Sequence, residues 1–370
     1  MSDAFKRPAL YYPYIHIRSE HWLKATLLCV PAVKRMVPDE YTPEDLPNIV
    51  TYTKIKGLNG TLLQTVPSYS PAADAAQRSL LVKLKEHEDE ILARYHRSQV
   101  SGPDSYWIHD AKFNGELLRY LDAKGLAWQS ADPTDAYGHR TWYALNPVLG
   151  SAIMTTLALS TASEEPYDIV TPSAEFHETL LTVNVDAIFN ILLAGKRPGT
   201  AQTTSQASHD LGQMVITMSG VNFQALRPEA IPELQSSEHF GRFQNLIKTK
   251  ARTFELNSEP RDYETQLRLE AGEIITAWHE TKGDLSKELK DALFETSLVL
   301  AGGTLKSMIQ KEPNMIDLAI EGGIAIALLT RKGLQLLEKR KDGGPTHYLS
   351  EILEAQSEVL QMTFPLGLER

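Results

Sequence analysis

The strongest chemical signal in this sequence is a set of polar residues that follow two expected strands. His16 and Arg18 follow a β-branched and aromatic run near the N-terminus, and His109, Asp110 and Lys112 come at the end of a second short run. Because α/β folds place their clefts at strand ends, we expect these side chains to lie near one another. One hypothesis is a hydrolase or nuclease in which His16 or His109 is the general base. Asp110 would then orient the base, while Arg18 and Lys112 would bind an anionic substrate.

The same residues fit a purely structural interpretation. Asp110 precedes a polar segment where a carboxylate favours the start of a helix through the helix dipole, and the two histidines can satisfy nearby backbone groups. No spacing among these residues is specific to a known reaction. We therefore favour the structural interpretation, and the sequence alone does not define a function.

Motifs that would carry a familiar chemistry are missing from the sequence. It contains no G-x-x-x-x-G-K-[ST] loop, no G-x-G-x-x-G, no H-E-x-x-H and no G-x-S-x-G. Cys29 is the only cysteine, which excludes an intrachain disulfide and a four-cysteine zinc site. Arg340 and His347 have the spacing of an R-x(4–6)-H ribonuclease motif, but a Gly-Gly-Pro turn lies between them. We therefore predict no cofactor and no metal ligands.

The bulk composition limits the classes of protein that remain. The chain has 370 residues, 42% of them hydrophobic, with 37 Lys+Arg against 47 Asp+Glu and a net charge of −10. These values exclude a disordered chain and a multi-span membrane protein, and the acidic balance makes broad nucleic-acid binding unfavourable. The lone cysteine and the polar start, without the order of a signal peptide, predict a cytoplasmic protein.

Strand-like and helix-like patterns alternate through about residue 195, and the later sequence is helical. This predicts an α+β protein with an N-terminal mixed α/β domain of short strands at 1–195. A polar loop or linker follows at 196–210, and a mainly helical domain occupies 211–370. No membrane span is expected, because Asn146 and Pro147 interrupt the longest uncharged stretch, 141–163.

Several elements are predicted from local patterns. Strands are expected at 10–17, 49–55, 61–66, 106–109, 167–171 and 214–218. A helix from Ser19 is expected to continue past a kink at Pro31 until Pro38, Pro43 and Pro47 end it. Ser70-Pro71 and Asn146-Pro147 are typical of helix starts, and Gly125 of a helix end.

Two apolar segments with paired glycines, 298–304 and 321–329, form an expected Gly-rich hairpin. Charged residues bracket both segments, so each is too short to cross a bilayer. We interpret them as a closely packed helical pair in the core. The alternative is a membrane-acting effector that inserts this hairpin.

The N-terminal run LYYPYIH and the Trp22-Leu23-Lys24 that follows resemble a functionally uncharacterised bacterial protein family. The likeness continues through residues 108–112, 142–159 and 169–171. Where family members often have histidine and aspartate, this chain has Asn146 and Pro172, so chemistry dependent on those groups should be lost here. The resemblance implies no established activity, although some relatives look like accessory proteins of defence-associated gene sets.

Taken together, the sequence predicts a cytoplasmic accessory or regulatory protein that acts through protein–protein interaction, as a homo-oligomer or with a protein partner. A role in phage defence is part of this hypothesis. The hydrolase or nuclease and the membrane-acting effector remain the alternatives.

Overall fold

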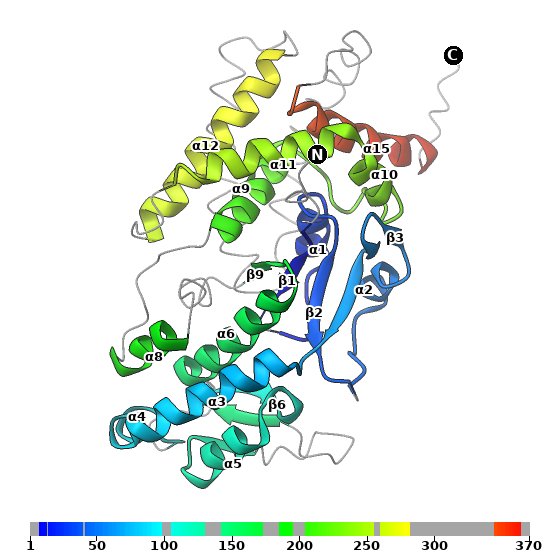
Figure 1. The fold of residues 1–370 in the computed structure, drawn as a ribbon. Coiled ribbons are helices and arrows are strands. Elements are labelled where there is room, and N and C mark those ends of the chain that lie inside the picture. The colour runs from blue at the N-terminus through cyan, green and yellow to red at the C-terminus, as the bar shows by residue number, and fades with distance from the viewer. Residues whose placement is uncertain are drawn as a thin grey trace, which may run out of the picture.

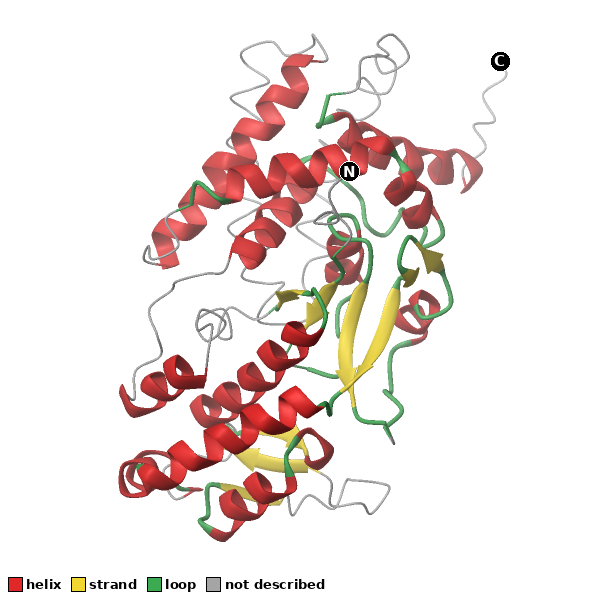
Figure 2. Cartoon of the chain, in the orientation of Figure 1, coloured by secondary structure: helices red, strands yellow, loops and turns green. Residues whose placement is uncertain are grey.

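The computed structural model describes residues 7–12, 14–39, 41–97, 105–129, 142–172, 185–194, 204–254, 260–281 and 344–363. Strands and helices are mixed in the first half of the chain, and the described part of the second half is helical (Figure 2). This arrangement confirms the predicted α+β class.

A central parallel sheet organises the N-terminal half. Its strand order is β5-β2-β1-β9, with all three pairings parallel. The strands are β1 (Ala9–Tyr11), β2 (Val33–Val37), β5 (Leu63–Pro67) and β9 (Asp168–Val170). The chain leaves β1 toward β2 and β5 and later returns to β9 on the other side of β1. The carboxyl ends of the strands therefore share one edge of the sheet, where α/β folds build their sites.

A smaller antiparallel sheet stands beside the central one, in the order β6-β8-β7. It consists of β6 (Tyr106–His109), β7 (Ala127–Gln129) and β8 (Trp142–Leu145). A short hairpin is formed by two strands of two residues each, β3 (Lys56–Gly57) and β4 (Gly60–Thr61). Gly60 takes a φ of 94° that only glycine adopts readily.

Helices of the N-terminal half pack around both sheets. They are α1 (Glu20–Leu27), α2 (Pro47–Tyr52), α3 (Pro71–Glu86), α4 (Glu88–Tyr95), α5 (Gly115–Ala123), α6 (Pro147–Glu164) and α8 (Val185–Ala194), with a 3-10 turn at Asp110–Lys112. The later helices are α9 (Thr204–Met218), α10 (Ala230–Ser236), α11 (Glu238–Ala251), α12 (Pro260–Thr281) and α15 (His347–Thr363). Figure 1 shows α9 to α15 gathered at the top and α3 to α6 at the bottom, with the central sheet between them.

Two hydrophobic cores lie on opposite faces of the central sheet. Along β1 the side chains alternate, because successive residues of a strand point to opposite faces: Ala9 and Tyr11 join one core, and Leu10 joins the other. The first core reaches the late helices through residues such as Phe243 and Tyr348, and the second contains α3 and α6. The first core thus combines strands from before residue 195 with helices after 204, and the division into two domains stays a prediction.

Local helix signals were predicted well. The hydroxyl of Ser19 accepts a hydrogen bond from the Trp22 amide at the start of α1, and Ser70 and Asn146 cap α3 and α6 in the same way. Gly125, with a φ of 65°, ends α5 as expected. These signals act over three or four residues and need no tertiary information.

Four predicted elements were wrong in whole or in part. The strand expected at 10–17 is much shorter, because β1 ends at Tyr11 and residues 14–17 are not in a strand. Residues 33–37 are strand β2 rather than helix, because α1 ends before Pro31 and the next residues are buried between β1 and β5. Residues 49–55 lie largely in α2, which starts with a proline in its first turn and buries Ile49 and Tyr52. Residues 214–218 end α9, since a short apolar run does not by its pattern distinguish helix from strand. Residues 204–210 of the expected linker also belong to α9, and 196–203 lie outside the described ranges.

Among the helices in the described ranges, none combines the length and the apolar character that crossing a lipid bilayer requires. The Gly-rich hairpin at 298–304 and 321–329 lies outside those ranges.

Gly150 lies where α6 packs tightly against the small sheet. A Cβ there would lie 2.8 Å from Cγ and 3.0 Å from Cβ of Tyr106, the first residue of β6. We expect Gly150→Ala to destabilise the protein by about 1–3 kcal/mol through overpacking, which outweighs the roughly 1 kcal/mol gained in helix propensity. Gly241→Ala in α11 is the matched control, because a Cβ there meets no atom within 4 Å. Urea unfolding should show opposite signs for the two variants, and equal effects would contradict this packing account.

Candidate functional site

The predicted His16 lies at the carboxyl edge of the central sheet. Its backbone carbonyl accepts a hydrogen bond of 3.0 Å from the hydroxyl of Tyr11, the last residue of β1. Its Nε2 lies 2.8 Å from the hydroxyl of Tyr41, which comes from the loop after β2. His16 is thus held by one residue at the end of β1 and by another in the loop after the neighbouring strand β2.

Tyr41 also brings the second predicted histidine to this edge. The Tyr41 ring lies 5.2 Å from the ring of His109 and 6.2 Å from that of Trp142, edge-on in both cases. His109 and Trp142 face each other across β6 and β8 with their ring centroids 5.3 Å apart. The structure therefore gathers His16 and His109 around a single tyrosine that the sequence analysis did not single out.

Both imidazoles are neutral at pH 7. Burial lowers the pKa of His16 and of His109 below the ordinary value of 6.5, because desolvation penalises the charged form. For His109 the nearby Asp110 carboxylate acts in the opposite direction but does not outweigh burial.

His109 and Asp110 both serve the turn that follows β6. The Nδ1 atom of His109 accepts a hydrogen bond of 3.2 Å from the Ala111 amide, and Asp110 Oδ1 accepts one of 2.6 Å from the same amide. Nδ1 of His109 also lies 3.0 Å from Asp110 Oδ1. A neutral imidazole has one donor and one acceptor nitrogen. With Nδ1 as the acceptor, the proton is on Nε2, and Nε2 then has no lone pair to act as a base.

The two predicted anion-binding residues have different surroundings. Arg18 is exposed and its guanidinium lies 5.6 Å from the centre of the Tyr14 ring. Lys112 is only 4% exposed, and burial lowers the pKa of its amine to about 7. A buried amine that loses its charge near neutral pH is poorly suited to bind an anion from solvent.

A buried ion pair holds the loop that carries His16. Arg35 of β2 donates to both carboxylate oxygens of Asp45, at 2.7 and 2.6 Å, and the two side chains are each 3% exposed. The same guanidinium donates to the carbonyl of Ile15 at 3.2 Å. This contact fixes the backbone next to His16.

Three tryptophans share the outer face of the small sheet, which we call the tryptophan face (Trp107, Trp128 and Trp142). Trp107 and Trp128 lie opposite Ala144 on its two sides, so all three point to the same face, and Trp142 is two residues from Ala144 on the same strand. The other face, with Ile108 and Leu145, belongs to the second core. Trp107 is 44% exposed and the other two are half-buried.

The tryptophan face is continuous with the histidines, since His109 is paired with Trp142 on this same face. The tryptophan face could not be predicted from local patterns, because it exists only once β6, β7 and β8 pair in this register. The signal available in the sequence was a tryptophan in each of these three short strands.

Cys29 does not offer a second reactive group, because burial raises the pKa of its thiol and disfavours the thiolate. Comparisons with protein-family models, with curated proteins and with solved structures gave no match to this chain. Its function is therefore inferred from the residues and geometry described above.

Proposed function

We propose that this chain is a cytoplasmic accessory protein that acts by binding a protein partner through the tryptophan face, in the phage-defence setting that the sequence resemblance implies. The observation that carries the proposal is the partial exposure of Trp107, Trp128 and Trp142 on one sheet face. Tryptophan is enriched among the residues that dominate binding energy at protein interfaces. The acidic net charge of −10 favours a protein over a nucleic acid as the ligand.

The strand-end residues support the same proposal, because the fold itself uses them. His109 and Asp110 hold the turn after β6, His16 is bonded to Tyr41, and Lys112 is buried. Such groups organise the backbone beside the tryptophan face without needing a substrate.

Site-specific photocrosslinking in the host cell tests the proposal. A photoreactive amino acid is placed at position 107 and, as controls, at Val82 of α3 and Leu269 of α12, which are 54% and 53% exposed. We expect a discrete protein adduct from position 107 that the additional change Trp128→Ala abolishes. Equal adducts from all three positions, or none from position 107, would contradict the proposal.

The second candidate is a hydrolase or nuclease with His16 and His109 as bases. The specific observation in its favour is that both imidazoles are neutral near pH 7 and contact the same tyrosine. In this case Nδ1–H of His109 would donate a hydrogen bond to Asp110, and the unprotonated Nε2 could accept a proton.

A double variant separates the two candidates. We expect His16→Ala with His109→Ala to lose about 2 kcal/mol of unfolding free energy, since a turn cap and a side-chain hydrogen bond are each worth about 1 kcal/mol. Both groups have a lowered pKa, so the unfolded chain takes up their protons first as the pH falls through 6.5. The wild type should therefore lose more stability than the variant between pH 7 and pH 5. If the double variant kept the unfolding free energy of the wild type but lost a hydrolytic activity, the hydrolase or nuclease would be favoured instead.

A further inference from the structure

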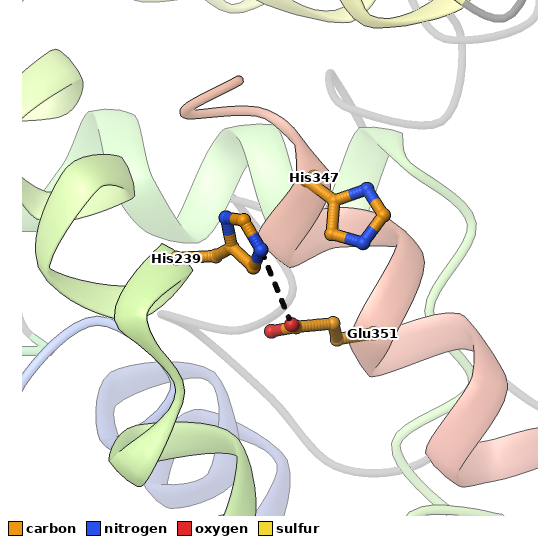
Figure 3. Close-up of side chains that lie close together, drawn as sticks. All are labelled: His239, His347 and Glu351. Atoms are coloured by element: carbon orange, nitrogen blue, oxygen red, sulfur yellow. Dashed lines mark ion pairs between the residues drawn. The ribbon is translucent and has the colours of Figure 1, made fainter. Parts of the chain in front are cut away.

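A second cluster of ionisable side chains lies where two helices of the C-terminal half begin. His239 is the second residue of α11, and His347 and Glu351 belong to the first turns of α15 (Figure 3). Residues four apart lie on one face of a helix, so His347 and Glu351 lie on the same side of α15, beside His239. None of the three takes part in the tryptophan face.

The donor atoms of this cluster lie within reach of a single ion. One ligand atom from each residue lies within 4.8 Å of the other two, and His239 Nε2 is 3.8 Å from Glu351 Oε1. The two imidazole rings are 4.5 Å apart. Tetrahedral zinc with bonds of about 2.1 Å places its ligands roughly 3.4 Å apart, so small side-chain rotations suffice to close the site.

Two atoms of the cluster are buried without a hydrogen-bond partner, Nδ1 of His239 and Oε2 of Glu351. Leaving a buried polar atom unsatisfied is costly, and a bound ion is one way to satisfy Oε2 of Glu351. Nδ1 of His239 does not point to an ion here, because Nε2 is the nitrogen that faces Glu351. The remaining carboxylate oxygen of Glu351 is oriented, since it accepts a hydrogen bond of 2.9 Å from Ser237, the residue that caps α11.

The charge balance favours a cation over an anion. Two helix N-termini meet here, and their dipoles alone would attract an anion. Glu351 and the neighbouring Glu238, whose Oε1 is 3.7 Å from His239 Nε2, supply two negative charges that oppose an anion and match a divalent cation. The nitrogen donors favour zinc or a similar transition metal over Mg²⁺ and Ca²⁺, which prefer oxygen ligands.

We propose that His239, His347 and Glu351 form a binding site for a divalent transition metal of the zinc class. Three protein ligands leave a fourth position for water or for a ligand from a partner. The metal ties the start of α15 to the start of α11, and so fastens a helix from the end of the chain to the first core.

Zinc titration of the full-length protein tests this site. The protein is stripped with a chelator, and Zn²⁺ binding is measured by calorimetry and by the shift in melting temperature. We expect one Zn²⁺ per chain and a higher melting temperature for the wild type. His347→Ala and Glu351→Gln should each weaken the affinity by more than about 100-fold, which exceeds the effect of outer-shell changes.

His87→Ala is the matched control, because it removes a half-exposed imidazole at the junction of α3 and α4 and should bind Zn²⁺ like the wild type. Circular dichroism establishes that each variant is folded, and the conservative Glu351→Gln guards against a variant that fails to fold. The visible spectrum of the wild type with Co²⁺ should show the intense bands of a four-coordinate site. The proposal would be overturned if the wild type did not bind Zn²⁺, or if His347→Ala and Glu351→Gln bound Zn²⁺ with the same affinity as the wild type.

Discussion

Asp45→Ala is expected to cost about 3–5 kcal/mol of unfolding free energy, because it leaves the Arg35 guanidinium buried without its counter-charge. Arg35 is 2% exposed, and Asp45 receives both of its short hydrogen bonds. Since Arg35 also holds the Ile15 carbonyl, the loss should loosen the backbone that places His16 against Tyr41. Urea unfolding at pH 7 measures the effect.

Arg242→Ala is the control for an exposed ion pair. Arg242 and Glu238 are separated by 3.4 Å, with side chains 50% and 64% exposed. Exposed pairs of this kind contribute at most about 1 kcal/mol. If Asp45→Ala cost no more than this control, the Arg35–Asp45 pair would not hold the edge of the sheet.

Lys112→Met is expected to stabilise the protein by about 3–5 kcal/mol at pH 7. Burial lowers the pKa of Lys112 from 10.5 to about 7, and each unit of pKa corresponds to about 1.4 kcal/mol. Between these two values the unfolded chain binds a proton that the folded protein does not, so the stability of the wild type rises with pH. The loss of unfolding free energy caused by burying this amine is therefore largest at and below pH 7, and it disappears near pH 10.5.

The advantage of Lys112→Met should accordingly shrink as unfolding is measured at increasing pH from 7 to 10. Lys124→Met, which removes a lysine whose side chain is 39% exposed, is the comparison variant. A destabilised Lys112→Met variant would instead indicate that the charged amine has a role in the folded protein, as the anion-binding hypothesis requires.

The sequence predicted the features that depend on neighbouring residues. The caps at Ser19, Ser70 and Asn146 and the glycine at 125 follow from hydrogen bonds within one helical turn. Strand β2 and the end of α9 were mistaken because most of their residues are buried by elements distant in sequence, so their short apolar runs show no clear period.

The candidate site was predicted in part. His16 and His109 were expected at strand ends and do meet, but they meet at Tyr41, a loop residue with no local pattern that sets it apart. The metal cluster needed the contact between α11 and α15, although the four-residue spacing of His347 and Glu351 at the start of the expected last helix was visible.

The most direct test of the account is the protonation state of His109, measured by nitrogen-15 NMR of the imidazole across a pH titration. We expect a neutral ring at pH 7, with the proton on Nε2 and with Nδ1 accepting a hydrogen bond from the Ala111 amide. We also expect a pKa for His109 below 6.5. A proton on Nδ1 shared with Asp110, leaving Nε2 basic with a pKa near 7, would contradict it. The strand-end histidine would then be poised for catalysis instead of completing the fold beside the tryptophan face.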